Sequence, residues 1–278
     1  MIVSDLDGTL LVEGGKIPPE NVRALQRASD RGLVVAMASG RLAPVCSRFA
    51  LDIGLPECRI IGMNGGMIWD RPYGEKISET PYPPALAETV LGILEAEGCR
   101  CSVYTQNSVF TNRRFDAEGR RGFSERFIRA GVRVEIADDA CPHALAEPVF
   151  KFLVKDATDH EGYERARTRI SALPGVYLTS SGRDNFEVMQ TGVGKARAVQ
   201  LLAERLGIPM SAVMAFGDYD NDIEMLAACG CAVAMGNGSP AAKAAAKYVT
   251  LENTACGVGY AVDALLDGKL EILEKGGC

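Results

Sequence analysis

The sequence predicts an α/β fold, in which a doubly wound parallel sheet carries an inserted α+β domain. Short apolar runs that end in Gly, Asp, Ser or Asn alternate with helical patterns near both ends of the chain. Such runs are typical of strands that a parallel sheet buries on both faces. Between the two ends, a stretch with a different pattern interrupts the alternation, which indicates an insertion.

Five apolar runs predict the strands of the main sheet. They are Ile2–Val3, Leu33–Ala38, Ile60–Met63, Val213–Phe216 and Cys231–Met235. In an open α/β sheet, ligands bind outside the carboxyl ends of the strands. The residues that directly follow these runs are therefore the first candidates for a functional site.

Three helical patterns lie between the runs. Residues 18–32 place apolar side chains on one face, with prolines at the start and a glycine just past the end, the usual asymmetry of a helix. Residues 195–207 repeat the pattern and also close on a glycine. Residues 239–248 begin with Ser239, a good N-cap, and Pro240, a good first residue.

The middle of the chain predicts a separate domain. The segment Thr80–Pro84 resembles a linker, and after it we expect helices and strands at 85–98, 101–105, 120–130, 150–154, 163–172 and 176–189. We therefore expect residues 1–80 and 187–278 to form one discontinuous core domain, and residues 81–186 to form an inserted α+β domain.

Composition limits the possible partners and location. Of 278 residues, 47% are hydrophobic and 24% charged, and the formal net charge is −6. This is an ordinary soluble composition, and the acidic balance argues against a nucleic-acid partner. No apolar stretch approaches the roughly 20 residues of a membrane span, and the first residues do not resemble a signal peptide. We expect a cytoplasmic monomer or homodimer that acts on a small molecule.

The cysteines predict no zinc site and no disulfide framework. There are nine, without a CxxC pair, and only two histidines. The expected role is that of reduced thiols that pack as small core hydrophobes.

Polar or glycine residues follow all five apolar runs. In chain order they are Asp5 and Asp7; Ser39, Gly40 and Arg41; Asn64, Gly65 and Gly66; Asp218, Asp220, Asn221 and Asp222; and Gly236, Asn237 and Gly238. Lys195 opens a helix and could reach the same edge. The topology predicts that these groups form one site.

The chemistry of this set points to phosphoryl transfer. Asp5, Asp7, Asp218 and Asp222 repel one another unless a cation joins them, and oxygen ligands without His or Cys favour Mg²⁺. A hydroxyl, a lysine and Mg²⁺ supply the positioning and charge neutralisation that the reaction needs. A carboxylate can also act as the nucleophile.

The ordered motifs "DLDGTL", "ASGR", a lysine at a helix start and "GDYDND" resemble those of the haloacid dehalogenase (HAD) superfamily. The stretch from Phe216 to Thr250 is similar to the Cof-type phosphatases, which carry a type IIB α/β cap where this chain has its insertion. The resemblance implies a HAD-like Rossmannoid core, and a Mg²⁺-dependent phosphatase that acts on small phosphomonoesters, sugar phosphates first. The cap would determine substrate specificity.

The resemblance also implies roles for the matching residues. Asp5 would be the nucleophile that becomes an aspartyl phosphate. Asp7 would be the general acid and base, and its main-chain carbonyl would bind Mg²⁺. Ser39 would donate a hydrogen bond to the phosphoryl group, and Lys195 would neutralise charge. Asp218 and Asp222 would bind the metal. Substrate contacts would come from Gly40, Arg41, Asn64 and Asn221, and Asn221 could orient Lys195 instead.

Plainer interpretations exist for several residues. Asp220 is the expected bystander of its cluster, and Asn237 could simply turn the chain. In the inserted domain, Lys151, Arg183 and Asp184 could face substrate, although a surface or hinge role is favoured. The charged run 113–121 is expected to be a solvated face.

Two other functions use related chemistry. A phosphomutase would form the same aspartyl phosphate and pass it to another hydroxyl. A receiver-type signalling module would accept phosphate without turnover, but it needs neither a second acid at Asp7 nor an insertion of this size.

Overall fold

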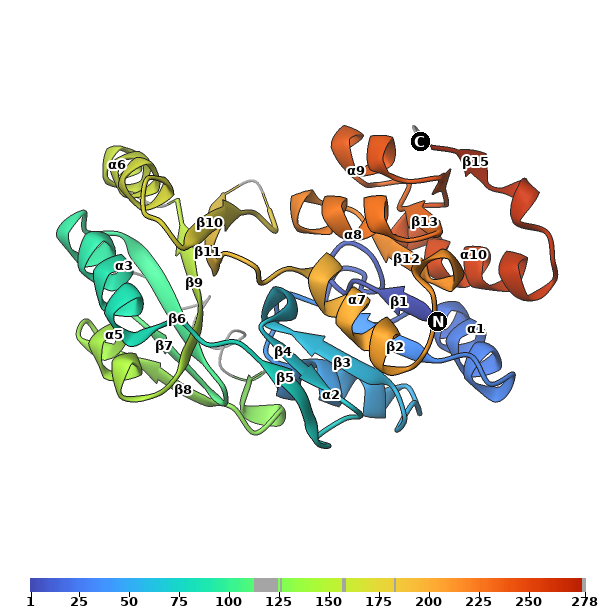
Figure 1. Cartoon of the computed structure of the whole chain (residues 1–278), viewed down its shortest axis with the longest axis horizontal. Coiled ribbons are helices and arrows are strands. Elements are labelled where there is room, and N and C mark those ends of the chain that lie inside the picture. The colour runs from blue at the N-terminus through green and yellow to red at the C-terminus, as the bar shows by residue number, and fades with distance from the viewer. Residues whose placement is uncertain (113–124, 126, 157–158, 183, 277–278) are drawn as a thin grey trace. The chain divides into compact units, whose positions relative to one another are not determined.

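The computed structural model describes residues 1–112, 125, 127–156, 159–182 and 184–276 (Figure 1). The chain forms two compact units, one made of residues 1–78 and 194–278 and the other of residues 79–193. The second crossing lies later in the chain than the expected boundary after residue 186. The reason is that strand β11 (Asn185–Gln190) pairs with β9 (Val149–Lys155), which keeps the chain in the inserted sheet.

The first unit contains the predicted sheet. Its nine strands lie in the order β15-β14-β13-β12-β1-β2-β3-β4-β5. The five predicted runs correspond to β1 Ile2–Ser4, β2 Val35–Ala38, β3 Arg59–Gly62, β12 Met214–Gly217 and β13 Cys231–Ala234, all parallel. Four short strands extend the edges, namely β4 Met67–Trp69, β5 Lys76–Glu79, β14 Tyr248–Val249 and β15 Glu274–Lys275.

The topology places a ligand site at the centre of this sheet. β1 pairs in parallel with β2 on one side and β12 on the other. The chain runs outward from β1 through β2 and β3, and later returns to the opposite side of β1 at β12. The strand order therefore reverses between β1 and β12, which is where open α/β sheets bind their ligands. Asp5 follows β1 directly, and Asp218 follows β12.

Helices cover the sheet of the first unit. They are α1 Pro19–Asp30, α2 Ala43–Asp52, α7 Lys195–Arg205, α8 Ile223–Ala228, α9 Pro240–Ala245 and α10 Gly257–Leu266. α7 and α8 pack on one face, where Val199 and Leu202 meet Val3 in a common core. Although α1 and α10 are far apart in the sequence, they lie side by side (Figure 1).

The predicted helix ends agree in part with the structure. The Oγ of Ser239 accepts a hydrogen bond from the amide of Ala242 at 3.2 Å, which confirms the predicted N-cap. α9 stops at Ala245, earlier than the pattern over 239–248 predicted, because Tyr248 already belongs to β14. Short 3₁₀ turns connect other elements, namely η1 Met63–Gly65, η3 Met210–Ala212, η4 Asp220–Asp222, η5 Asn253–Ala255 and η6 Leu270–Ile272.

The second unit is a six-stranded sheet covered by helices on one face. Its strands lie in the order β10-β11-β9-β6-β7-β8, with β6 Arg100–Thr105, β7 Ser108–Thr111, β8 Arg133–Ile136 and β10 Val176–Thr179. Among the described residues, its helices include α3 Pro84–Ala96, α5 Ala140–His143 and α6 His160–Ser171, and η2 spans Ala144–Ala146. Phe152 and Val188 point into the core beneath them. The run 113–121 and Arg183 lie outside the described residues.

The described helices are all too short or too polar to span a bilayer.

Candidate active site

The site residues of the first unit meet at the carboxyl ends of its central strands. Lys195 is the first residue of α7, and its ammonium donates to Asp5 Oδ1 at 2.6 Å and to Asp222 Oδ1 at 2.7 Å. All three residues are buried. Burial alone lowers the pKa of Lys195, but Asp222 and Asp5 raise it by more, so the ammonium stays charged.

A close contact between two glycines allows Lys195 to reach the strands. Gly194 precedes α7 in an extended conformation, and Gly65 has φ +102°. A Cβ on Gly65 would stand 2.5 Å from the carbonyl oxygen of Gly194, closer than non-bonded atoms approach. The turn after β3 therefore needs glycine if α7 is to begin beside Asp5.

Three carboxylates can bind one metal ion here. Asp5, Asp218 and Asp222 each offer an oxygen, and these atoms lie within 4.8 Å of one another. Burial and neighbouring negative charges raise the pKa of Asp5, against the opposing effect of Lys195. Burial and the charge of Asp222 raise the pKa of Asp218 from 3.8 to about 7. Three carboxylates face one lysine, so the site has a net negative charge. A hard divalent cation such as Mg²⁺ would balance this charge and prefers oxygen ligands.

Asp222 is held more firmly than a simple metal ligand. Its Oδ2 accepts from the amides of Asp218 at 3.0 Å and Tyr219 at 3.4 Å, while its Oδ1 accepts from Lys195. A Cβ on Gly217 would stand 2.4 Å from the Cβ of Asp222, which is closer than non-bonded atoms approach. Asp222 can therefore pack against the end of β12 only because residue 217 is glycine. Asp222 thus orients both Lys195 and the loop that carries Asp218.

Asp5 and Asp7 have different partners. Arg41 binds Asp7 through two hydrogen bonds, Nε to Oδ2 at 2.7 Å and Nη2 to Oδ1 at 2.5 Å. The side chain of Asp7 is 48% exposed, whereas that of Asp5 is 6% exposed. β1 ends at Ser4, so the alternation of an extended strand does not continue to Asp7. The Arg41–Asp7 contact was not anticipated from the sequence.

The other predicted residues connect neighbouring loops. Asn64 donates its backbone amide to the carbonyl of Ser39 at 2.9 Å, and its Oδ1 accepts from Asn221 Nδ2 at 3.3 Å. Ser39 Oγ accepts from the amide of Arg41 at 3.2 Å, and Gly40 lies between them. The loops after β2, β3 and β12 are therefore joined.

Two further residues lie beside the candidate metal-binding carboxylates, Asp220 and Thr9. Asp220 is exposed, and the described metal cluster does not include it. Thr9 was given no role, but its hydroxyl donates to Asp218 Oδ1 at 3.0 Å. A hydroxyl residue directly after the Asp-x-Asp-Gly turn was the signal in the sequence that could have identified it.

The second unit contains a buried ion pair. Lys151 Nζ donates to Glu187 Oε1 at 3.1 Å and lies 4.8 Å from the centre of the Tyr104 ring. Lys151 and Glu187 are 3% and 2% exposed. Lys151 alternates with Phe152, which packs under the helices, so its side chain belongs to the opposite face of the sheet.

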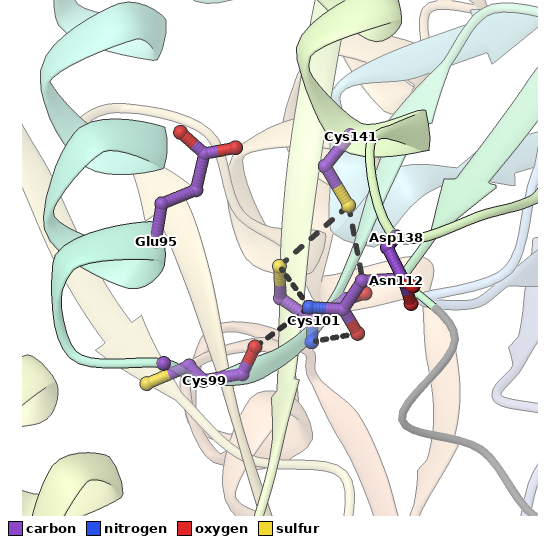
Figure 2. A pocket seen from close by; sticks show the side chains of 7 residues that line it. Glu95, Cys99, Cys101, Asn112, Asp138 and Cys141 are labelled. Atoms are coloured by element: carbon purple, nitrogen blue, oxygen red, sulfur yellow. Dashed lines mark hydrogen bonds between the residues drawn. The ribbon is translucent and has the colours of Figure 1, made fainter.

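The second unit also contains a pocket of about 440 Å³ (Figure 2). Its lining comprises Glu95, Gly98, Cys99, Cys101, Asn112, Asp138 and Cys141. The sulfur atoms of Cys101 and Cys141 lie 3.7 Å apart. Cys99 turns its sulfur away from this pair (Figure 2), toward the carbonyl of Gly162 at 3.7 Å. The three thiols thus do not converge on one point, and the eight described cysteines are all free.

Comparison with known proteins places these features in context. Residues 2–262 match the family of haloacid dehalogenase-like hydrolases. The chain is 28% identical to the 5-amino-6-(5-phospho-D-ribitylamino)uracil phosphatase YwtE of Bacillus subtilis, covering 96% of this chain and 98% of that one. It is 30% identical to an HMP-PP phosphatase of Cronobacter sakazakii, covering 85% and 84%.

A solved structure has the same architecture. A sugar phosphatase of HAD subclass IIB superposes with a TM-score of 0.80, covering 95% of this chain and 98% of the other. The sequences are 23% identical, so this likeness concerns the fold, which includes the inserted α/β unit.

Proposed function

The chain belongs to the family of haloacid dehalogenase-like hydrolases, and from this premise we propose that it is a Mg²⁺-dependent phosphatase of small phosphomonoesters. The observation that carries the proposal is the position of Lys195, whose ammonium donates hydrogen bonds to both Asp5 and Asp222. One oxygen each of Asp5, Asp218 and Asp222 lie within 4.8 Å of one another at the same place. Sugar phosphates are the substrates we favour first. The similar phosphatases named above act on small phosphorylated molecules, as their names state, which supports this choice.

In the first step, a carboxylate oxygen of Asp5 attacks phosphorus, and the bond from phosphorus to the ester oxygen breaks. Asp7 gives its proton to the departing oxygen. Lys195 neutralises charge on Asp5 and on the phosphoryl oxygens. Mg²⁺, bound through Asp5, Asp218, Asp222 and the main-chain carbonyl of Asp7, would supply the further positive charge.

In the second step, Asp7 takes a proton from water as that water attacks the phosphorus of the aspartyl phosphate. The bond between Asp5 and phosphorus breaks, which releases inorganic phosphate and restores both carboxyl groups. The Ser39 hydroxyl would donate to the phosphoryl group in both steps. Asn64 and Asn221 would hold the loops that surround it.

The contact between Arg41 and Asp7 would represent the enzyme before substrate binds. Two N–H donors from a guanidinium favour the charged form of a carboxylate, whereas Asp7 needs a proton to act as an acid. We propose that Arg41 turns from Asp7 to the phosphoryl group when substrate binds. Asp7 is then released to take up the proton that it donates.

The unit of residues 79–193 would select the substrate. Its position, inserted within the core of a fold that resembles subclass IIB, supports this assignment. We further propose that the protein acts in the cytoplasm, as a monomer or homodimer, without nucleic acid.

Phosphate release from a panel of sugar phosphates, nucleotides and cofactor phosphates tests the proposal. We expect release with Mg²⁺ and none with EDTA. An Asp5→Asn variant as active as the parent would overturn the mechanism. Isomerised product without net phosphate would identify a mutase, and stable labelling by acetyl phosphate without turnover would identify a receiver-type module.

A further inference from the structure

Two asparagine side chains hold the loop that carries Asp7. Asn237 Nδ2 donates to the carbonyl of Gly8 at 2.8 Å, and Asn253 Nδ2 donates to the carbonyl of Leu11 at 2.8 Å. Asn237 Oδ1 also accepts from the backbone amide of Asn253 at 2.8 Å. The two residues therefore form one clamp, with a contact on each side of Thr9.

The orientation of both amide groups is fixed by their partners. Asn253 Oδ1 accepts from the amide of Thr254 at 3.0 Å, so its NH₂ group faces Leu11. In Asn237 the oxygen faces an N–H and the nitrogen faces a carbonyl. Exchanging oxygen and nitrogen in either amide would place donors against donors and acceptors against acceptors.

The glycines on each side of Asn237 allow this loop to dock. A Cβ on Gly236 would stand 2.8 Å from the amide nitrogen of Glu252, and one on Gly238 would stand 2.9 Å from the carbonyl of Met235. The amide of Ser239 donates to the carbonyl of Asp218 at 2.8 Å. The Gly-Asn-Gly segment thus fixes one loop against two parts of the active site.

The clamp reaches Asp7 through the backbone. Asp7 forms an isolated β-bridge with Leu11, and the carbonyl of Leu11 is the acceptor for Asn253. Gly8, which follows Asp7, has φ +77° and carries the acceptor for Asn237. A Cβ on Gly8 would stand 2.3 Å from Asp218 Oδ2, so the residue that follows Asp7 lies directly against the Asp218 carboxylate.

We propose that Asn237 and Asn253 are positioning residues for the proton transfer by Asp7. The inference rests on the proposed function, in which Asp7 protonates the leaving group. A general acid must lie within hydrogen-bond reach of the atom that it protonates. Without the clamp, the loop of residues 8–11 would be less restrained, and the Asp7 carboxyl group would meet the leaving oxygen less often.

Leaving-group dependence separates this role from a structural one. An alkyl phosphomonoester needs a proton on its leaving oxygen, whereas p-nitrophenolate leaves without one. We expect Asn237→Ala and Asn253→Ala to lower kcat/KM about 10–100-fold for a hexose phosphate and less than about threefold for p-nitrophenyl phosphate. Asp7→Asn should show the same contrast more strongly.

Lys243→Met is the matched control. Lys243 Nζ donates to the carbonyl of Gly236 at 2.6 Å, in the same loop, and none of the described hydrogen bonds joins it to residues 8–11. It should lower kcat/KM equally for both esters, or not at all. Asn237→Asp keeps the shape and the acceptor for Asn253 but loses the donor for Gly8, so it should behave like Asn237→Ala, and it replaces that variant if the alanine chain does not fold.

Equal losses for the two esters in the asparagine variants, or no loss, would overturn the inference while leaving the phosphatase proposal intact. The same contrast in Lys243→Met would overturn it as well. Full activity of Asp5→Asn would instead overturn the proposed function itself.

Discussion

Two buried lysines, one in each unit, differ in the charge that surrounds them, and this difference distinguishes the proposed reactive site from a simple ion pair. Lys195 contacts two carboxylates at 2.6 and 2.7 Å, with a third nearby, so negative charge is in excess around it. Lys151 contacts Glu187 at 3.1 Å, and the two charges cancel. Both lysines are buried to a similar degree. Burial alone therefore does not identify a site, whereas an uncompensated charge does, because it calls for a cation or a substrate.

The largest expected effect comes from removing the proposed nucleophile, Asp5, beside Lys195. Asp5→Asn keeps the size of the side chain but cannot form an aspartyl phosphate. We expect kcat to fall by about 10⁴-fold or more, measured as phosphate release with Mg²⁺. Glu187→Gln is the matched control in the other pair, and its folded fraction should keep the parental kcat. Equal losses of kcat in the two variants would remove the distinction between the sites.

The second prediction concerns the stability of the structural pair. Lys151→Met leaves Glu187 buried without this partner, so the free energy of unfolding should fall by about 3–5 kcal/mol. Urea denaturation measures it. The double variant Lys151→Met/Glu187→Leu removes both charges and should recover most of the loss, since a buried pair is often replaceable by apolar groups. No recovery in the double variant would mean that the pair does more than cancel its own charges.

The third prediction uses the pKa of Asp218, which is about 7 in the folded protein, whereas an unperturbed aspartate has a pKa of 3.8. Between these values the metal-free native protein binds more protons than the unfolded chain, so its stability falls as the pH rises from about 4 to about 7. Mg²⁺ replaces those protons. The increase in Tm caused by Mg²⁺ should therefore be larger at pH 8 than at pH 5.

Asp218→Asn is the control for this pH effect, because it removes the titrating group. It should reduce the decline in metal-free stability, to which Asp5 also contributes. The double variant Lys151→Met/Glu187→Leu leaves no unpaired buried charge and should leave the slope unchanged. An increase in Tm with Mg²⁺ that is the same at both pH values would contradict a role for Asp218 in metal binding.

Most of the core fold was predictable because local patterns dictate it. The apolar runs before Asp5 and Asp218 are bounded by turn residues and predict strands buried on both faces, and parallel topology then brings their ends together. The same reasoning brings Asp5, Asp218 and Asp222 together, whereas the fourth expected carboxylate, Asp7, binds Arg41 and is not part of the cluster. The short edge strands were not predictable, since β14 and β15 have two residues each and no periodicity.

Side-chain partners were less predictable than residue positions. Asp7 and Arg41 were both placed near substrate, but nothing in the spacing showed that they would bind each other. The same holds for Asn237, whose amide meets Gly8 across more than two hundred positions of sequence. For Lys151 the sequence left open a contact with substrate and favoured a surface or hinge role, and the side chain is buried against Glu187. Such contacts depend on the tertiary arrangement of loops, which the period of a strand or helix does not encode.

The smallest expected effect concerns a pair between the two extremes. The Arg41 and Asp7 side chains are 16% and 48% exposed, so their contact is neither buried nor fully solvated. Arg41→Lys keeps the charge and loses the two-pronged geometry. If Arg41 turns to the phosphoryl group, it holds substrate and transition state alike, and the variant should raise KM about tenfold with little change in kcat. Arg48→Lys, at the exposed Arg48–Asp52 pair, is the control and should change neither. A lower kcat at unchanged KM would place Arg41 with Asp7 throughout the reaction, which would make their contact permanent rather than a resting state.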